Sequence, residues 1–213
     1  MLSLAVAALI ACSPGNDPGL RPLPLAAPVA SDSLEDLYRS GRTWEDFYAA
    51  VNARRVLWTD NYEGPGLPDS LLTRARAVGG TWRFLVVAID SCSDSANTIP
   101  FLAKLVDAVP GLELRIVDPT AGRWVMEAHR TADGRAATPT VILLDESFGE
   151  RGCFVERPVA LRKMLAEAQG GDQDRFESKM AWYREDAGRS TVADLIGLLE
   201  SAAAGPTHCD PGA

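Results

Sequence analysis

The sequence predicts an α/β fold in which a mixed central sheet is flanked by helices, with helical extensions before and after this core. Four strand-length segments support this fold class, at residues 83–89, 112–118, 139–145 and 151–156. Helical segments at 93–108 and 121–130 separate the first three, which favours crossover connections. Only a short turn with Gly149 separates the last two, which predicts a hairpin. The order therefore predicts one sheet with both parallel and antiparallel strands.

The first predicted strand, RFLVVAI at 83–89, is continuously apolar. A strand buried on one face alternates apolar and polar residues, so a continuous run predicts helices on both faces of the sheet. The helix after it contains Pro100, and another helix begins at about residue 158. We place the α/β domain at residues 82–169.

The segment before this domain, residues 32–81, is predicted to be a helical extension. Its helices are expected at 33–40, 43–54 and 69–78. The stretch 56–68 is expected to be irregular because EGPGLP breaks regular structure.

A second helical segment, residues 170–204, is predicted after the domain. Apolar residues recur there at helical spacing, which predicts helices at 173–187 and 191–203. The last residues, 205–213, are rich in Pro and Gly and are expected to be disordered.

The composition excludes several classes of function. The 213 residues carry a net charge of −8 and show no basic stripe, so we expect no nucleic-acid partner. The two histidines, His129 and His208, are too few and too far apart for a histidine-rich metal site. We expect no metal and no cofactor. No apolar run approaches the roughly 18 residues that span a bilayer.

The N-terminus has the features of an export signal. Residues 1–12 hold a short apolar run followed by Cys12, and Leu9-Ile10-Ala11-Cys12 resembles a bacterial lipobox, in which the cysteine is lipidated. The alternative is an ordinary signal peptide in which Cys12 is incidental. Residues 13–31 carry five prolines and are expected to be a tether. We therefore expect a protein of the cell envelope, lipid-anchored to a membrane.

Cys92 is the candidate reactive residue because it follows a buried strand and begins a helix. The N–H groups and positive dipole end of a helix favour a thiolate, which is the attacking species in disulfide exchange. Asp90 and Asp94 lie close in sequence, and a nearby carboxylate disfavours ionisation of a thiol. The alternative is a small cysteine that only packs at the turn.

Residues 82–169 resemble the thioredoxin fold, and the longer stretch 43–203 resembles a bacterial thioredoxin-family branch with a Cys-x-Asp turn. Cys92 after a strand, Pro100 in the next helix and Thr138-Pro139 before the third strand carry the resemblance. It implies a cis peptide at Pro139, facing Cys92. It also implies that the Thr138 backbone pairs with an extended substrate peptide.

Ser95 departs from the dithiol members of this family, which have a second cysteine at that position. Three interpretations stay open: Cys92 acts as a monothiol, another cysteine resolves its adduct, or redox turnover is lost. In the resembled fold the third strand lies between the Cys92 strand and the strand of Cys153, which implies two strand spacings, roughly 10 Å. Cys153 is therefore expected to be a packing residue and only a possible accessory thiol. Cys209 could reach several places from the tail.

The expected function is that of a thioredoxin-like thiol/disulfide protein acting through Cys92, with Asp94, Ser95, Thr138 and Pro139 around it. Its partner would be a thiol- or disulfide-containing protein or a small thiol. The alternative is a non-catalytic binding module with the same fold. A copper-handling role is less favoured because the turn has one cysteine, and Ile89 argues against a peroxidase, which needs Thr or Ser there.

Overall fold

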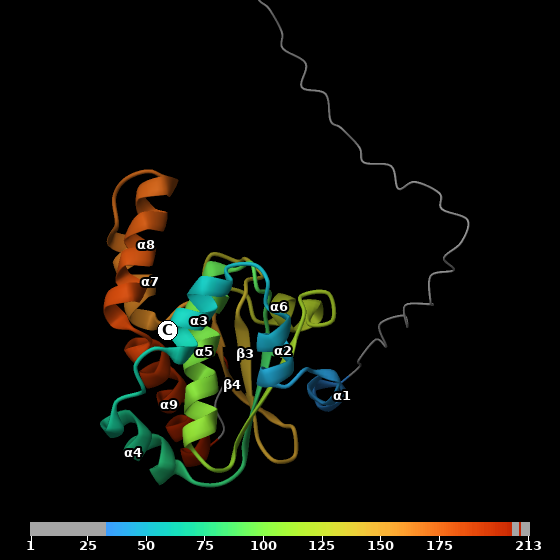
Figure 1. The fold of residues 1–213 in the computed structure, drawn as a ribbon. Coiled ribbons are helices and arrows are strands. Elements are labelled where there is room, and N and C mark those ends of the chain that lie inside the picture. The colour runs from blue at the N-terminus through green and yellow to red at the C-terminus, as the bar shows by residue number, and fades with distance from the viewer. Residues whose placement is uncertain (1–32, 206–208, 210–213) are drawn as a thin grey trace, which may run out of the picture.

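The computed structural model describes residues 33–205 and Cys209, which form a four-stranded sheet flanked by helices (Figure 1). The strand order is β2-β1-β3-β4. The strands are β1 (Trp82–Val87), β2 (Leu112–Val117), β3 (Thr140–Leu144) and β4 (Glu150–Val155). β1 is parallel to β2, while β3 is antiparallel to both β1 and β4. The predicted mixed sheet is confirmed.

Both faces of the sheet are covered, as the continuous apolar run of β1 predicts. Phe84 and Val86 face a core that includes α5 (Ser93–Ala108) and α9 (Arg189–Ala204). Leu85 and Val87 face a second core, formed with α1 (Leu34–Ser40) and α6 (Arg123–Ala128). All four side chains are fully buried. Successive residues point to opposite faces, so neither face tolerates a polar residue here.

The N-terminal extension contains α1, α2 (Trp44–Ala50), α3 (Arg55–Glu63) and α4 (Asp69–Val78). The expectation of irregular chain over 56–68 is wrong for α3. This helix forms because fully buried Trp58 packs against Trp44 and Phe47, with ring centroids 6.3 and 5.3 Å apart. Long-range aromatic packing stabilises a segment whose local composition is a poor guide.

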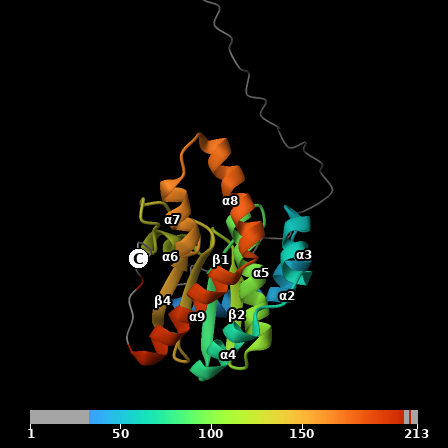
Figure 2. The same ribbon diagram turned by 90° about the vertical axis from the view of Figure 1, so that its left-hand side faces the viewer.

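The C-terminal segment contains α8 (Asp172–Asp186) and α9, after α7 (Val159–Glu167) of the α/β domain. Figure 2 shows α7 and α8 rising as a hairpin above the end of the sheet where α5 begins. Gly188 joins α8 to α9 with φ of +76°, and a Cβ there would lie 2.2 Å from the Phe101 ring of α5. Only glycine permits this close approach. None of the helices in residues 33–205 combines the length and the apolarity needed to cross a membrane.

A disulfide joins Cys153 of β4 to Cys209, with Cα atoms 4.9 Å apart. The expectation that Cys153 only packs is therefore wrong, and Cys153 is not a free accessory thiol in this structure. Cys209 lies against β4, although we expected it on a disordered tail. The strand order agrees with the expectation that one strand separates the strand before Cys92 from the strand of Cys153, because β3 lies between β1 and β4.

Removal of this disulfide is predicted to destabilise the fold. Cys209→Ser should lower the free energy of unfolding by about 2–4 kcal/mol, because the bond closes a loop of 56 residues and restricts the unfolded chain. Urea denaturation of the oxidised protein measures this. Reductant should bring the wild type down to the level of the variant and leave the variant unchanged. Equal midpoints for the variant and the oxidised wild type would contradict the prediction.

Candidate functional site

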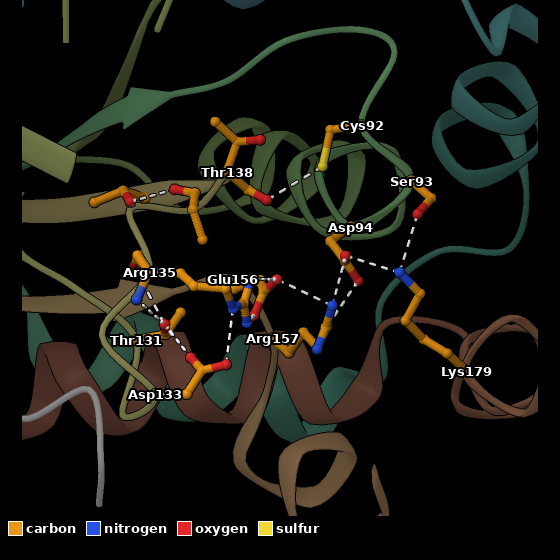
Figure 3. A network of polar contacts seen from close by, with 12 residues as sticks. Cys92, Ser93, Asp94, Thr131, Asp133, Arg135, Thr138, Glu156, Arg157 and Lys179 are labelled. Atoms are coloured by element: carbon orange, nitrogen blue, oxygen red, sulfur yellow. Dashed lines mark hydrogen bonds and ion pairs between the residues drawn. The ribbon is translucent and has the colours of Figure 1, made fainter. Parts of the chain in front are cut away.

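The Cys92 thiol lies between the start of α5 and the loop before β3 (Figure 3). Cys92 is the N-cap of α5, and its Sγ accepts a hydrogen bond from the Ser95 backbone N–H at 3.4 Å. The thiol donates to the Thr138 carbonyl at 3.2 Å. Cys92 as a residue is half-buried. The two hydrogen bonds orient the sulfur between the turn after β1 and the loop before β3, the two central strands.

The loop opposite Cys92 contains the cis peptide between Thr138 and Pro139, as the resemblance implied. Two contacts fix the backbone around it. The Thr140 hydroxyl donates to the Ala137 carbonyl at 2.7 Å, and the Glu156 N–H donates to the Pro139 carbonyl at 2.8 Å. The Thr138 carbonyl is thereby directed at the thiol rather than into the sheet.

Ser95 occupies the position at which a dithiol protein has its second cysteine. Its side chain is fully buried, and its hydroxyl has no hydrogen-bond partner within residues 33–205 and 209. An unpartnered buried hydroxyl is costly, so this position is a poor match for serine on stability grounds alone. The neighbouring Pro100 lies inside α5, as expected.

Asp94 is buried and is surrounded by partners from two other elements. Lys179 Nζ of α8 lies 2.8 Å from its carboxylate, the Tyr183 hydroxyl donates at 2.9 Å, and Arg157 binds it through two nitrogens at 3.2 and 3.3 Å. Lys179 also donates to the Ser93 hydroxyl at 3.1 Å. The Asp94 carboxylate is therefore fully engaged by cations and donors from outside the Cys92 turn.

The electrostatics of this cluster follow from burial and from the Asp94 charge. Burial, followed by the Asp94 charge, raises the pKa of the Tyr183 phenol well above its usual value. Burial lowers the pKa of the Arg157 guanidinium, but the hydrogen bond and charge of Asp94 outweigh it, so that pKa is raised. Both groups therefore keep their protons while they bind the carboxylate.

The cluster continues away from Cys92 as a chain of ion pairs. Arg157 also contacts Glu156 at 3.0 Å, and Glu156 is bound by Arg135 through two nitrogens at 3.0 and 2.9 Å. Arg135 in turn pairs with Asp133 at 2.7 Å. Figure 3 shows these side chains lying in a row beneath Cys92 and Thr138. The loop that leads to the cis peptide is thus linked to the active-site turn by charges.

Asp90, on the other side of Cys92, anchors the N-terminal extension. Its carboxylate accepts the backbone N–H groups of Asn52 and Ala53 at 3.0 and 2.8 Å. The Asn52 N–H is the main reason that the pKa of Asp90 is lowered. The Trp58 indole donates to the Asp90 carbonyl, and Arg54 donates to the Ser91 carbonyl. The Asp90 carboxylate is therefore bound to the N-terminal extension.

Sequence reasoning found Cys92, Asp94, Ser95, Thr138 and Pro139, but it missed Lys179, Tyr183 and Arg157. These three lie 63–89 residues from Asp94 along the chain, and no local motif marks them. No group of three metal-binding side chains occurs among the residues that the structure describes. Cys12 lies outside the described residues, as do 1–12, 13–31 and His208.

Mutation of the Asp94 cluster is predicted to destabilise the protein unequally. Asp94→Asn should cost about 3–5 kcal/mol because it leaves buried cations without their carboxylate. Lys179→Met should cost about 1.5–3 kcal/mol, through the lost hydrogen bonds of a charged group. The double variant should cost less than the sum, because the two residues are coupled. Chemical denaturation of all three variants measures this.

The exposed pair Arg74–Glu200 provides a matched control for this cycle, with its atoms 2.7 Å apart and both side chains more than 40% exposed. Arg74→Met should cost no more than about 1 kcal/mol. If Lys179→Met and Arg74→Met lower the free energy of unfolding by similar amounts, the buried cluster stabilises the fold no more than an exposed pair does. Strict additivity of the Asp94 and Lys179 changes would show that the two residues are not coupled.

Comparisons with known proteins agree with the fold. A family model described as Thioredoxin matches residues 41–169. A Pseudomonas aeruginosa protein of unknown function is 25% identical, with a TM-score of 0.65 over 80% of this chain and 98% of that one. An HIV epitope scaffold shares the fold at 24% identity, with a TM-score of 0.63 over 79% and 98%. No curated protein matches. Since the family match spans more than half of the sequence, the chain belongs to the thioredoxin family.

Proposed function

We propose that this protein exchanges thiols and disulfides through Cys92 alone. The observation that carries the proposal is the position of the Cys92 sulfur. The residue is half-buried, and its sulfur receives an N–H from the first turn of α5 and lies against the Thr138 carbonyl beside the cis peptide. A sulfur in this setting has a stabilising donor.

The proposed chemistry is a single exchange step. The Cys92 thiol loses its proton to solvent, and the thiolate attacks one sulfur of a partner disulfide. The S–S bond of the partner breaks, a new disulfide forms to Cys92, and the second half leaves as a thiolate. Ser95 has no thiol, so a neighbouring group cannot release the adduct. The thiolate of an external thiol must attack the partner's sulfur in the adduct. The bond to Cys92 then breaks, a disulfide forms between the partner and the external thiol, and Cys92 leaves as a thiolate.

Cys153 and Cys209 do not offer a resolving thiol while they are bonded to each other. This supports the monothiol interpretation over the one in which Cys153 resolves the adduct. The partner in the proposal is a protein or a small molecule that carries a thiol or a disulfide.

We place the protein in the cell envelope, anchored through a lipid on Cys12. A structural disulfide supports an oxidising compartment, because thiols in the cytoplasm are kept reduced. The Leu9-Ile10-Ala11-Cys12 motif and the proline-rich stretch after it support the anchor.

A second candidate is a binding module without redox turnover. The unpartnered, fully buried Ser95 hydroxyl favours it, since this arrangement fits a fold that once held a second cysteine and has lost it. In that case the surface around Cys92 and the cis peptide would bind a partner without covalent chemistry.

The reactivity of Cys92 decides between the two candidates. With an excess of an oxidised small thiol, the folded wild type should form a mixed disulfide at Cys92, which mass spectrometry detects. Turnover in a protein-disulfide reduction assay should be slow. Ser95→Cys should raise turnover by at least about tenfold, because release becomes intramolecular. Ser147→Cys, on the exposed β3–β4 turn, is the control and should not raise it. The absence of any Cys92 adduct would leave the binding module.

Lipidation is tested separately from redox chemistry. A fatty-acid analogue supplied to expressing cells should label the wild type and should not label Cys12→Ser, because only the cysteine thiol accepts the lipid. Cys92→Ser should be labelled as strongly as the wild type. Equal labelling of the wild type and Cys12→Ser would exclude the anchor.

A further inference from the structure

A groove lined by basic residues lies beside the Cys92 site, between the α7–α8 hairpin, the end of β4 and the loop before the cis peptide. It consists of two adjoining hollows of about 190 and 260 Å³, which share Arg157, Leu165 and Arg175. We call it the arginine groove and define it by its basic side chains, Arg135, Arg157, Arg162, Arg175 and Lys179.

The arginine groove adjoins Cys92 on two sides. Arg157 and Lys179 both bind Asp94, which lies two residues after Cys92. Arg135 belongs to the loop that leads to Thr138, whose carbonyl accepts from the thiol. Figure 3 shows Arg135 and Arg157 on the same side of the Cys92–Thr138 contact. The groove therefore begins next to the two segments that contact the Cys92 sulfur.

The lining of the groove holds more basic than acidic side chains, although the whole chain carries a net charge of −8. Its five basic side chains face three lining carboxylates, Asp133, Glu156 and Asp172. Asp133 and Glu156 are already bound by Arg135 and Arg157. Asp94 lies beneath the lining and is bound by Arg157 and Lys179.

Arg175 is the groove residue most available to a ligand. Its side chain donates to the Leu165 carbonyl at 2.9 Å, and it makes no ion pair within the described segments. It is exposed on the first turns of α8, where Phe176 beside it is 39% exposed. A planar guanidinium in this setting suits a carboxylate, which it can bind through two nitrogens.

We propose that the arginine groove binds carboxylate groups next to the reacting disulfide, so that Cys92 prefers acidic disulfides as substrates. This inference rests on the proposed function and names its substrate class. The exchange step is the one given above, with the carboxylate-bearing half transferred to Cys92. Attraction by the groove raises the rate of encounter rather than the reactivity of the sulfur.

Three probe disulfides of different charge test this preference. Oxidised glutathione is acidic, bis(2-hydroxyethyl) disulfide is neutral and cystamine is basic. The rate of adduct formation at Cys92 is measured by mass spectrometry for the wild type and for Arg175→Gln. The variant should react roughly two- to fivefold more slowly with oxidised glutathione. Its rate with the neutral probe should equal that of the wild type. Because each rate is compared with the wild-type rate for the same probe, intrinsic differences between the disulfides cancel.

Two further variants separate charge at the groove from net charge and from folding. Arg175→Lys should recover most of the rate with oxidised glutathione. Arg74→Gln removes one positive charge on α4 and should leave every rate unchanged. Added salt should slow the acidic probe selectively, because the Debye length shrinks to about 8 Å at physiological ionic strength.

The outcomes distinguish the two proposals. If no probe forms an adduct, the proposed exchange function fails, and the substrate preference fails with it. If all probes react but Arg175→Gln changes none of the rates, or slows all three equally, exchange stands and the arginine groove is not a carboxylate site. A faster reaction of the variant with oxidised glutathione would also overturn the inference.

Discussion

The buried carboxylate of Asp94 is the constraint on which the rest of the site depends. A carboxylate in a protein interior is strongly destabilising unless cations and donors surround it. Here they come from outside the turn, from Arg157 after β4 and from Lys179 and Tyr183 on α8. The C-terminal helices are therefore held to the α/β domain at Asp94, two residues after Cys92. Their position and that of the turn are set together.

The turn around Cys92 is fastened from both directions. Asp90 holds the N-terminal extension through two backbone N–H groups, and Asp94 holds the C-terminal segment through charged side chains. The donors to Asp90 are neutral backbone N–H groups, whereas the donors to Asp94 include positively charged side chains. The two carboxylates thus have different roles, although they are equally close to the cysteine in sequence. Local sequence suggested one effect on the thiol for both, and the fold gives each a separate partner.

Local pattern was enough to predict the sheet and the helix from 93, and the resemblance to the thioredoxin fold predicted the cis peptide. Strand length and apolar runs depend on neighbours in sequence, and Pro139 has a fixed place in the resembled fold. The helix α3, the disulfide and the partners of Asp94 were beyond such reasoning. Each depends on a contact between residues far apart in the sequence or in different elements. These are the ring contact between Trp58 and Trp44, the disulfide between Cys153 and Cys209, and the ion pair between Lys179 and Asp94. Long-range packing decides these features, and no spacing rule encodes it.

The contacts of α8 with Asp94 also determine which part of the chain forms one folding unit. The family match ends at residue 169, ahead of Lys179 and Tyr183. A fragment cut there would keep Asp94 buried with fewer of its cations, and would uncover the apolar face that α9 covers on α5. The thioredoxin-like region is consequently not a module that can be exchanged between proteins on its own. A recombined gene that keeps this fold must therefore include α8 and α9 together with the segment that contains Cys92.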